Sequence, residues 1–370
     1  MFNHAVEYYN SAKLDEAEEL LQKILAANPG NVSCLKLMGV IAYDKNAYEQ
    51  ACDIFYDLHK HFPDDEETLF QLAGALQAWG KLSESLEYYN LALQLLPNNV
   101  DIYNNIGIIY QLQGNSAKAE GYFQKALATN NGNISALNNL GLLARSAGDT
   151  EQAISYFKQA QAIDGKDVST LFNLANTLRE NDGLDEALLL YERALLLAPD
   201  NPALRNSYGI ALEKNREEDK ALQQYKKSIA LDPGFTEARV NAAILLMSNE
   251  QLQEAKELLL GVIKKQPDNM DALANLGAIA HQQGLLVEAI EYYRKTLLLN
   301  PDALDTCMNV AFLLHETGEL DEAIGMYFNV AAKGHRSERL DSALKKAIED
   351  YRKINVEDAD KLLSLWEQHK

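Results

Sequence analysis

The sequence predicts an all-α solenoid of ten helix–turn–helix repeats followed by a helical cap. Three observations lead to this fold class. Proline recurs at an interval of 34 residues, glycine marks a second break inside each interval, and small and aromatic residues hold constant places between the breaks. Because the three patterns share one register, a single structural unit repeats along the chain.

The prolines define the repeat. Seven of the eight lie on one lattice with a spacing of 34 residues: Pro29, Pro63, Pro97, Pro199, Pro233, Pro267 and Pro301. Asn131, Gly165 and His335 occupy the three remaining lattice points, and Pro202 lies off the lattice. Because proline cannot continue a helix, each lattice point marks the end of one helical pair and the start of the next. We number each repeat so that its lattice point is position 32.

A second break divides each repeat into two helices. Glycine stands 17 residues before the lattice point in five repeats: Gly80, Gly114, Gly148, Gly284 and Gly318. Glycine tolerates the left-handed conformation that closes a helix, so the sequence predicts a turn there. Repeats seven and eight carry Asn215-Arg216 and Asn249-Glu250 instead, and we expect these two turns to be looser.

The second helix of each repeat carries a small residue followed by an aromatic residue. Position 20 is alanine in nine repeats and Ser85 in the other: Ala17, Ala51, Ala119, Ala153, Ala187, Ala221, Ala255, Ala289 and Ala323. An aromatic side chain follows four residues later in eight repeats: Phe55, Tyr89, Phe123, Phe157, Tyr191, Tyr225, Tyr293 and Tyr327. The small residue lets two helices approach closely, and we expect the aromatic rings to pack in the core.

Together these residues resemble the tetratricopeptide repeat (TPR). That family has Leu-Gly in its first helix, a turn glycine, and then Ala, Tyr or Phe, Ala and Pro. One repeat shows the pattern nearly complete: Asn139-Leu140-Gly141, Gly148, Ala153, Phe157 and Ala160. The resemblance covers residues 1–335, with the first repeat truncated because Met1 already lies inside its first helix. It implies a right-handed superhelix whose first helices line the concave surface.

Residues 336–370 leave the lattice. They hold eight basic and eight acidic residues, so the net charge of −20 belongs to the repeats. One apolar helical stripe is formed by Leu340, Leu344, Ala347, Ile348 and Tyr351, and a second helix contains Leu362, Leu363, Leu365 and Trp366. Asn355 is a plausible N-cap for the second helix. We predict that these two helices cap the apolar end of the last repeat, as solenoids require.

Composition excludes several classes of partner. With 34 Lys and Arg against 54 Asp and Glu, the chain is poorly suited to nucleic acid or an anionic membrane surface. The N-terminal sequence shows no signal peptide, and no apolar run is long enough to insert in a membrane. Cys34, Cys52 and Cys307 have no CxxC spacing, which suits a reducing compartment. We therefore expect a soluble, cytoplasmic protein.

No motif for catalysis or for cofactor binding is present. The sequence lacks a Gly-rich phosphate loop, HExxH, GxSxG and a metal-spaced cysteine set, so we expect no enzyme, no cofactor and no metal. His281 and His315 are one repeat apart, and Cys307 lies on the same predicted helix as His315. A metal site needs three or four convergent ligands, so packed or solvated histidines are the better interpretation.

The clearest functional signal is a ladder of asparagines at position 6. The residues are Asn105, Asn139, Asn173, Ser207, Asn241, Asn275 and Asn309, in repeats four to ten. Asparagine is a below-average helix former, so its recurrence in the middle of a helix needs a reason. Position 6 lies roughly 150° around the first helix from the core positions, in a stripe with positions 2, 9 and 13. With the family's geometry, this stripe follows the concave surface.

An amide side chain has one acceptor and two donors, which match the C=O and N–H groups of an extended peptide. First helices roughly 8–10 Å apart and a rise of roughly 3.3 Å per residue would bring one rung to every third peptide residue. The ladder resembles that of O-linked N-acetylglucosamine transferases, in which Asn before Leu-Gly holds peptide backbone. The alternative is that each Asn bonds to the neighbouring repeat and only rigidifies the stack.

The residues around the ladder suggest the chemistry of a ligand. Position 9 supplies Ile108, Leu142, Asn176, Ile210, Ile244 and Phe312, and position 2 supplies Asp101, Glu237, Asp271 and Asp305. These side chains favour an extended peptide with neutral to basic residues. Taken singly, each acidic residue is explained equally well by the dipole of its helix.

Three functional interpretations remain open at the level of sequence. The first is a scaffold that binds an extended peptide segment of a protein partner. The second is a scaffold that self-associates through the ends of the solenoid. The third is the substrate-recognition arm of a protein glycosyltransferase, because residues 1–30 look like the start of bacterial chains that carry such an enzyme downstream.

Overall fold

The computed structural model describes residues 1–333, 335 and 337–368; Gly334, Arg336, His369 and Lys370 lie outside the described residues. This described part contains 22 α-helices and no strand, so the predicted all-α solenoid is confirmed. Odd-numbered helices α1 to α19 are the first helices of the ten repeats, and even-numbered helices α2 to α20 are the second. We call them A helices and B helices.

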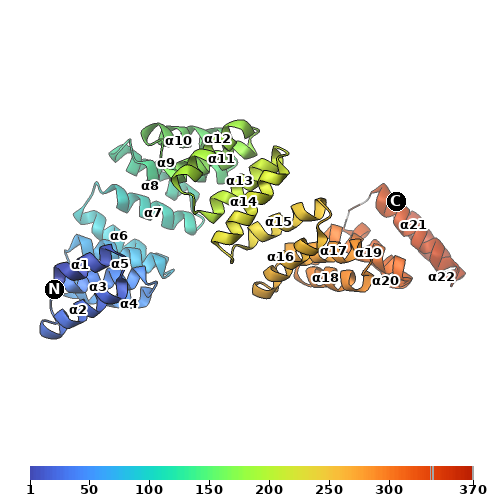
Figure 1. Ribbon diagram of the computed structural model, residues 1–370, viewed down its shortest axis with the longest axis horizontal. Coiled ribbons are helices and arrows are strands. Elements are labelled where there is room, and N and C mark those ends of the chain that lie inside the picture. The colour runs from blue at the N-terminus through green and yellow to red at the C-terminus, as the bar shows by residue number, and fades with distance from the viewer. Residues whose placement is uncertain (334, 336, 369–370) are drawn as a thin grey trace. The chain divides into compact units, whose positions relative to one another are not determined.

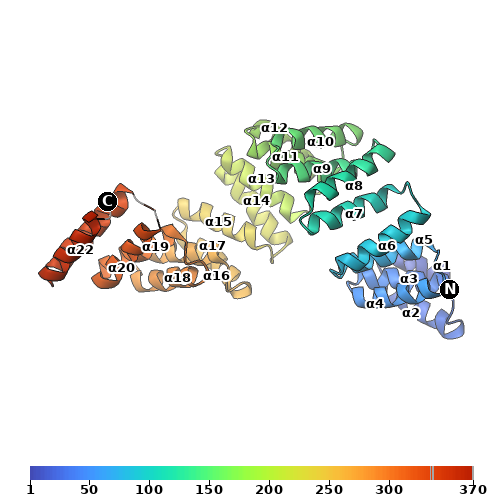
Figure 2. The ribbon, with the colours of Figure 1, turned by 180° about the vertical axis from the view of Figure 1, so that it is seen from behind.

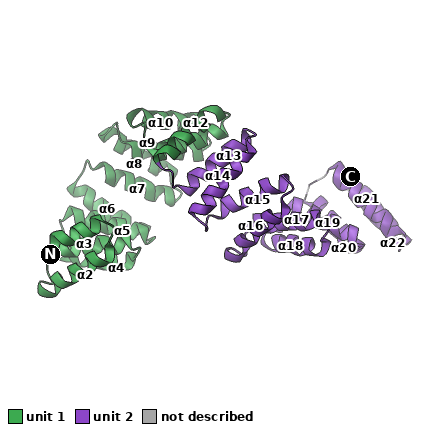
Figure 3. Ribbon diagram, viewed as in Figure 1, with its two compact units in different colours: residues 1–197 green, residues 198–370 purple. Residues whose placement is uncertain are grey.

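The chain divides into an N-terminal unit, residues 1–197, and a C-terminal unit, residues 198–370 (Figure 3). The N-terminal unit contains α1 (Phe2–Asn10), α2 (Leu14–Ala27), α3 (Val32–Asp44), α4 (Tyr48–His61), α5 (Glu66–Ala78), α6 (Leu82–Leu95), α7 (Val100–Leu112), α8 (Ser116–Thr129), α9 (Ile134–Ser146), α10 (Thr150–Ile163), α11 (Val168–Glu180) and α12 (Leu184–Leu197). The C-terminal unit contains α13 (Pro202–Lys214), α14 (Glu218–Leu231), α15 (Thr236–Ser248), α16 (Leu252–Lys265), α17 (Met270–Gln282), α18 (Leu286–Leu299), α19 (Leu304–Thr317), α20 (Leu320–Ala332), α21 (Glu338–Arg352) and α22 (Val356–Gln368).

The two helices of a repeat meet where a small residue at position 8 of helix A faces the aromatic ring at position 24 of helix B. A Cβ added to Gly107 would lie 2.4 Å from the ring of Phe123, and one added to Gly141 would lie 2.5 Å from the ring of Phe157. Both distances are far shorter than a van der Waals contact, so each ring fills the space of a missing side chain. The rings are fully buried, as the core assignment predicts.

Position 20 is fully buried in all ten repeats, which confirms that a small residue is needed there. Ser85 is the one polar residue at this position. Its hydroxyl donates a 2.6 Å hydrogen bond to the carbonyl oxygen of Ala73 on the facing helix A. The serine is therefore tolerated because its buried hydroxyl is satisfied by the backbone.

Every turn between an A helix and its B helix contains one residue in the left-handed conformation. Five are the predicted glycines, and the other five are Ala12, Asn46, Asp182, Arg216 and Glu250 with φ between 56° and 61°. The expectation of looser turns in repeats seven and eight is wrong. Glu217 N–H donates to the carbonyl of Leu212 at 2.9 Å, which reproduces the 2.9 Å bond from Asp149 to Ala144 beside Gly148. Packing of the helical pair imposes the same turn whatever residue is present.

Most A helices begin with a side-chain N-cap that the sequence analysis did not identify. In seven repeats an Asn or Asp accepts a hydrogen bond from the backbone N–H three residues later: Asn31, Asp65, Asn99, Asn133, Asp167, Asn201 and Asn269. This satisfies one of the free donors at the start of the helix. The cap follows the lattice point by two residues, so the proline break and the cap together set where each A helix starts.

Within each unit, most successive A helices contact one another directly (Figures 1 and 2). The pairs include α7 with α9 and α9 with α11 in the N-terminal unit, and α13 with α15 and α15 with α17 in the C-terminal unit. No two successive B helices in the described residues contact one another to that extent. We call the exposed surface of the A helices, at positions 2, 6, 9 and 13, the A face.

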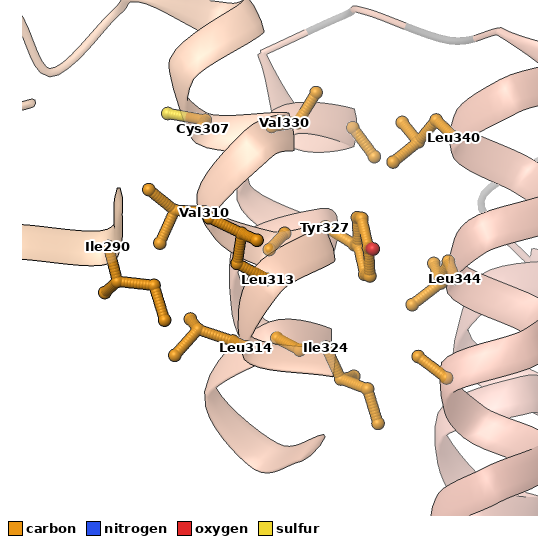
Figure 4. Close-up of a cluster of buried hydrophobic side chains, with 14 of the residues drawn as sticks. Ile290, Cys307, Val310, Leu313, Leu314, Ile324, Tyr327, Val330, Leu340 and Leu344 are labelled. Atoms are coloured by element: carbon orange, nitrogen blue, oxygen red, sulfur yellow. The ribbon is translucent and has the colours of Figure 1, made fainter. Parts of the chain in front are cut away.

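The helices α21 and α22 follow the last repeat. Leu340, Leu344 and Ile348 of α21 are buried in one cluster with Ile324 and Tyr327 of α20 (Figure 4). Trp366 of α22 is fully buried in the same cluster. The Oδ1 atom of Asn355 accepts a 3.2 Å hydrogen bond from the N–H of Asp358, as expected of an N-cap. The boundary at residue 335 and the capping role stay predictions.

A polar contact also joins α21 to the last repeat. Nε2 of His315 on α19 lies 2.9 Å from Oδ2 of Asp350 on α21. Hydrogen bonds from Lys353 and then from His315 hold the pKa of Asp350 at about 2, well below its usual value. The Asp350 carboxylate is therefore charged at neutral pH and favours the docked position of α21.

We predict that glycine stabilises the protein when it replaces a left-handed residue in the turns of repeats seven and eight. A left-handed conformation costs an ordinary residue roughly 1–2 kcal/mol, part of which is offset because glycine loses more freedom on folding. Arg216→Gly and Glu250→Gly should each raise the free energy of unfolding by about 0.5–1 kcal/mol, measured as a higher urea midpoint. Gly148→Ala is the matched opposite change and should lower it. An unchanged midpoint for both glycine variants would contradict this account.

We predict that weakening or removing the contacts of α21 and α22 with the last repeat lowers the stability of the protein. Leu344 is fully buried, so Leu344→Ala should lower the free energy of unfolding by about 2–5 kcal/mol. Removing residues 336–370 should expose the apolar side chains of α20 and cause aggregation. Lys346→Ala, at an exposed position of the same helix, serves as the control. A monodisperse truncated protein with the melting temperature of the full chain would show that α21 and α22 do not cap the solenoid.

Candidate functional site

The structure places all seven ladder residues in the interior of A helices, and each is half-buried on the A face. Asn105, Asn139 and Asn173 lie on α7, α9 and α11 of the N-terminal unit. Those of the C-terminal unit are Ser207, Asn241, Asn275 and Asn309, on α13, α15, α17 and α19. The ladder is thus described as one segment of three rungs and one of four.

Two rungs have unused hydrogen-bonding groups. Within the described residues, no group is hydrogen-bonded to the side-chain amide of Asn139 or of Asn173. Apart from the backbone hydrogen bonds of its own helix, Asn173 accepts one bond among the described residues. It runs from the hydroxyl of Thr177 to the backbone carbonyl oxygen of Asn173, at 2.7 Å. These two amides lie on neighbouring helices that contact each other, α9 and α11. They can therefore accept and donate bonds to a bound molecule without first breaking bonds within the chain.

Two other rungs lie near a tyrosine of the preceding repeat. Burial raises the pKa of Tyr89 and of Tyr293, and an interaction with Asn105 and with Asn309, respectively, opposes that rise. Both hydroxyls are therefore neutral at physiological pH.

The last two asparagines bond elsewhere. Nδ2 of Asn241 donates a 3.0 Å hydrogen bond to Oδ1 of Asn206 on the preceding A helix. Nδ2 of Asn275 donates a 2.8 Å hydrogen bond to the carbonyl oxygen of Asp271 in its own helix. The alternative interpretation of the ladder, a bond to the neighbouring repeat, therefore holds at Asn241 but not at Asn139 or Asn173.

Bonding between repeats is concentrated one residue earlier, at position 5, where the sequence analysis assigned no role. Nδ2 of Asn104 donates to Oδ1 of Asn133 at 3.0 Å, and Nδ2 of Asn138 donates to Oγ1 of Thr170 at 2.9 Å. Both asparagines are buried, and both bonds reach the start of the next A helix. In the sequence, the pairs of adjacent asparagines Asn104-Asn105 and Asn138-Asn139 could have indicated this bonding between repeats. Adjacent positions on a helix face different neighbours, so the two asparagines of a pair have different partners.

Family models described as tetratricopeptide repeat match residues 2–66, 65–132, 100–166, 144–209 and 240–305. Together these matches cover well over half of the chain. The chain belongs to the tetratricopeptide repeat family. Membership in this family explains why the same residue pattern recurs every 34 residues. It does not identify the partner of this TPR chain.

Curated relatives match this TPR chain over single stretches. Anaphase-promoting complex subunit 6 of Arabidopsis thaliana is 29% identical over 115 residues, which is 30% of this chain and 21% of that protein. Photosystem I assembly protein Ycf3 of Rippkaea orientalis is 31% identical over 107 residues, 28% of this chain and 62% of that protein. The chain therefore spans less than two thirds of the length of both relatives.

Solved structures show the same fold. The Cut9–Hcn1 hetero-tetramer of APC/C has a TM-score of 0.56 at 14% identity, covering 93% of this chain and 74% of that one. PilW, a type IV pilus biogenesis factor, has a TM-score of 0.52 at 20% identity, covering 55% and 94%. At these identities the likeness establishes the TPR solenoid alone.

The A face of the C-terminal unit combines carboxylates with apolar side chains. Glu237, Asp271 and Asp305 are exposed in the first turns of α15, α17 and α19. Ile244 and Phe312, at position 9, are 43% and 48% exposed. This part of the TPR surface offers negative charge beside apolar contact area; the neutral to basic ligand stays a prediction.

The histidines considered as metal ligands have structural partners. His281 lies with its ring centroid 6.2 Å from that of Phe312, and His315 bonds Asp350. Cys307 is buried, and burial raises the pKa of its thiol. The described residues contain no group of three or more side chains placed to hold a metal ion. No helix there is long and apolar enough to span a membrane. The cytoplasmic location stays a prediction.

Positions 5 and 6 predict opposite effects on stability. Asn138→Ala should lower the free energy of unfolding by about 1–3 kcal/mol, because the change leaves the buried Thr170 hydroxyl without this partner. Asn139→Ala should leave it unchanged or slightly higher, because alanine is the better helix former. Urea denaturation of the two variants measures the difference. If Asn139→Ala were the less stable variant, its side chain would have a structural role.

Proposed function

We propose that this chain is a protein-interaction scaffold that holds an extended peptide segment of a partner along its A face. The observation that carries the proposal is the pair of half-exposed, unbonded amides of Asn139 and Asn173 on adjoining A helices. In the middle of a helix, asparagine is less favourable than alanine by several tenths of a kcal/mol. Without a structural bond to offset this loss, a ligand is the best explanation for these two residues.

An extended peptide suits the chemistry of the rungs. Each amide offers an oxygen acceptor and two N–H donors, which complement the N–H and C=O groups of a peptide backbone. A helices packed roughly 8–10 Å apart match about three residues of an extended chain. Successive rungs would therefore meet equivalent backbone groups, so the ladder would hold the backbone and the flanking side chains would select the sequence.

The relatives support an interaction role of this general kind. Their names refer to a complex subunit and to an assembly protein. The resemblance of Asn139-Leu140-Gly141 and Asn275-Leu276-Gly277 to the ladder of O-linked N-acetylglucosamine transferases supports the finer proposal of backbone binding. The hypothesis of a substrate-recognition arm for a glycosyltransferase draws on that same resemblance and has no further support among the described residues.

Charge on the A face defines the class of partner. Glu237, Asp271 and Asp305 lie beside exposed apolar residues of the C-terminal unit, and the repeats carry the whole net charge of −20. Like charges would repel an acidic segment, and the field would steer a basic one toward the surface. We propose a neutral to basic segment as the ligand. A strongly acidic consensus among selected peptides would contradict this part of the proposal.

Self-association through the ends receives less support. The outward edge of α1 presents His4 and Glu7, both exposed, at positions that carry mostly apolar residues in the other repeats. A polar edge does not drive the burial of a second copy, because association depends mainly on apolar area.

Peptide titration tests the ladder directly. Twelve-residue peptides would be selected from a random library on the full chain and titrated by calorimetry. One hydrogen bond contributes about 0.5–1.5 kcal/mol net, so Asn139→Ala with Asn173→Ala should weaken binding by about 5- to 150-fold. The melting temperature should hardly change. Wild-type affinity in this double variant, or a selection that yields no ladder-dependent peptide, would reject the proposal.

A matched control is available in the same helices. Asn104→Ala with Asn138→Ala removes two asparagines that are buried and bonded between repeats. This control should lower the melting temperature and leave peptide affinity close to that of the wild type. The pair of double variants therefore separates a loss of ligand contacts from a loss of stability.

A further inference from the structure

A cavity of about 480 Å³ lies at the junction between repeats four and five, beside the turn that joins α9 to α10. It belongs to the N-terminal unit and is bounded by the start of α8, the second half of α9 and the start of α10. None of its lining residues occupies the A-face positions 2, 6, 9 or 13. Its walls include Leu143, Ala144, Ala147 and Tyr156, together with the exposed carboxylates of Glu120 and Asp149.

The cavity exists because this junction lacks apolar side chains that other junctions have. Position 17 is leucine in six repeats and Ser116 in repeat four. Position 21 is apolar in seven repeats: Cys52, Leu86, Ile154, Leu188, Leu222, Ile290 and Ile324. In repeat nine, Ile290 is buried in one cluster with Leu314, position 11 of the next A helix (Figure 4). The equivalent pair between repeats four and five is Glu120 and Ala144, which leaves space and a carboxylate instead of a filled apolar contact.

Two other repeats also have a charged residue at position 21, and each pairs with an opposite charge in the next repeat. Oε2 of Glu18 lies 2.5 Å from Nζ of Lys45, which is position 14 of repeat two. Nζ of Lys256 lies 2.9 Å from Oε1 of Glu288, which is position 19 of repeat nine. A charge at position 21 is thus compensated across the junction in both repeats.

Repeat five supplies no such partner to Glu120. Its positions 14 and 19 are Ala147 and Gln152, which carry no charge. Oε1 of Glu120 accepts a 2.9 Å hydrogen bond from Nε2 of Gln124, a neutral residue of the same helix. Among the described residues, no basic side chain lines the cavity or forms an ion pair with Glu120. The junction therefore has the acid of the Glu18–Lys45 pair without its lysine.

We propose that this cavity binds a lysine or arginine side chain of a partner protein, in the place that Lys45 occupies between repeats one and two. The aliphatic stem of the bound side chain lies against Leu143, Ala144 and Tyr156, as long basic side chains commonly do on apolar surface. Its charged end pairs with Glu120. The site lies outside the A face, so the inference goes beyond the proposed function and does not depend on the ladder.

Charge determines the class of partner. Asp149 adds a second carboxylate to the cavity, although its Oδ1 atom already accepts the N–H of Gln152 at 3.0 Å as the N-cap of α10. The two carboxylates favour a cation and disfavour an acidic segment. A second copy of this chain is a poor occupant, because two chains with a net charge of −20 repel each other. The occupant is an exposed basic residue of a different protein.

Filling the cavity from within tests the inference. Twelve-residue peptides would be selected from a random library on the full chain, and those that fail to bind the Ala147→Lys variant would be kept. These peptides should share a lysine or arginine. Replacing that residue by alanine, or Glu120 by Gln, should weaken binding by about 10- to 100-fold, the range of a hydrogen bond between charged groups. The absence of such peptides, or the absence of a shared basic residue, would overturn the inference.

A matched variant separates the cavity from the general negative field. Glu151 is exposed in the first turn of α10 and does not line the cavity. Glu151→Gln removes the same charge as Glu120→Gln and should leave affinity nearly unchanged. An equal loss in both variants would overturn the inference. Asn139→Ala with Asn173→Ala should also leave these peptides bound, so a failure of the ladder and a failure of the cavity give different results.

Measurements without peptide complete the test. Ala147→Lys should raise the melting temperature in the presence of Glu120 and not in the Glu120→Gln background, because the new lysine pairs with that carboxylate. An equal effect in both backgrounds would contradict the equivalence with Lys45. If Ala147→Lys does not fold, Glu120→Leu restores the apolar residue of other repeats and serves as the blocking variant. A wild-type dimer that a blocking variant converts to monomer, seen by sedimentation, would identify a second copy as the occupant and overturn the inference.

Discussion

The structure depends on one contact, between a residue without a large side chain on helix A and a buried ring on helix B. At Gly107 and Gly141 the ring stands where a Cβ would be, so any larger residue would force the two helices apart. The contact fixes how closely and at what angle each pair packs. Because eight of the ten repeats pair a small residue with a ring in this way, the same geometry recurs along each unit.

A second set of interactions keeps neighbouring repeats in register. Asn104 and Asn138 reach from one A helix to the capped start of the next, and Lys36 does the same through 2.8 Å and 2.5 Å ion pairs with Asp65 and Glu67. The capping residue therefore accepts two kinds of hydrogen bond. One comes from a backbone N–H group in the first turn of its own helix, and the other comes from a side chain of the preceding repeat. These hydrogen bonds between buried polar side chains make the stacking specific.

These two constraints explain why adjacent asparagines have different roles. Position 5 points toward the next repeat, where it is buried and bonded. Position 6 lies on the A face, where Asn241 is bonded to Asn206 of the preceding repeat and the amides of Asn139 and Asn173 have no bonded partner among the described residues.

Sequence alone determined the helical repeat, because the proline lattice, the turn glycines and the small and aromatic residues are local signals that recur in register. It also determined that position 6 lies on the A face, since helical periodicity requires it. The tertiary structure decided the conformation of Arg216 and Glu250, because the packing of a helical pair outweighs the local cost of a left-handed residue. It likewise decided which amides are free. Asn139 and Asn241 occupy the same position in their repeats, and only the side chains that neighbouring repeats bring beside them leave one unbonded and join the other to Asn206.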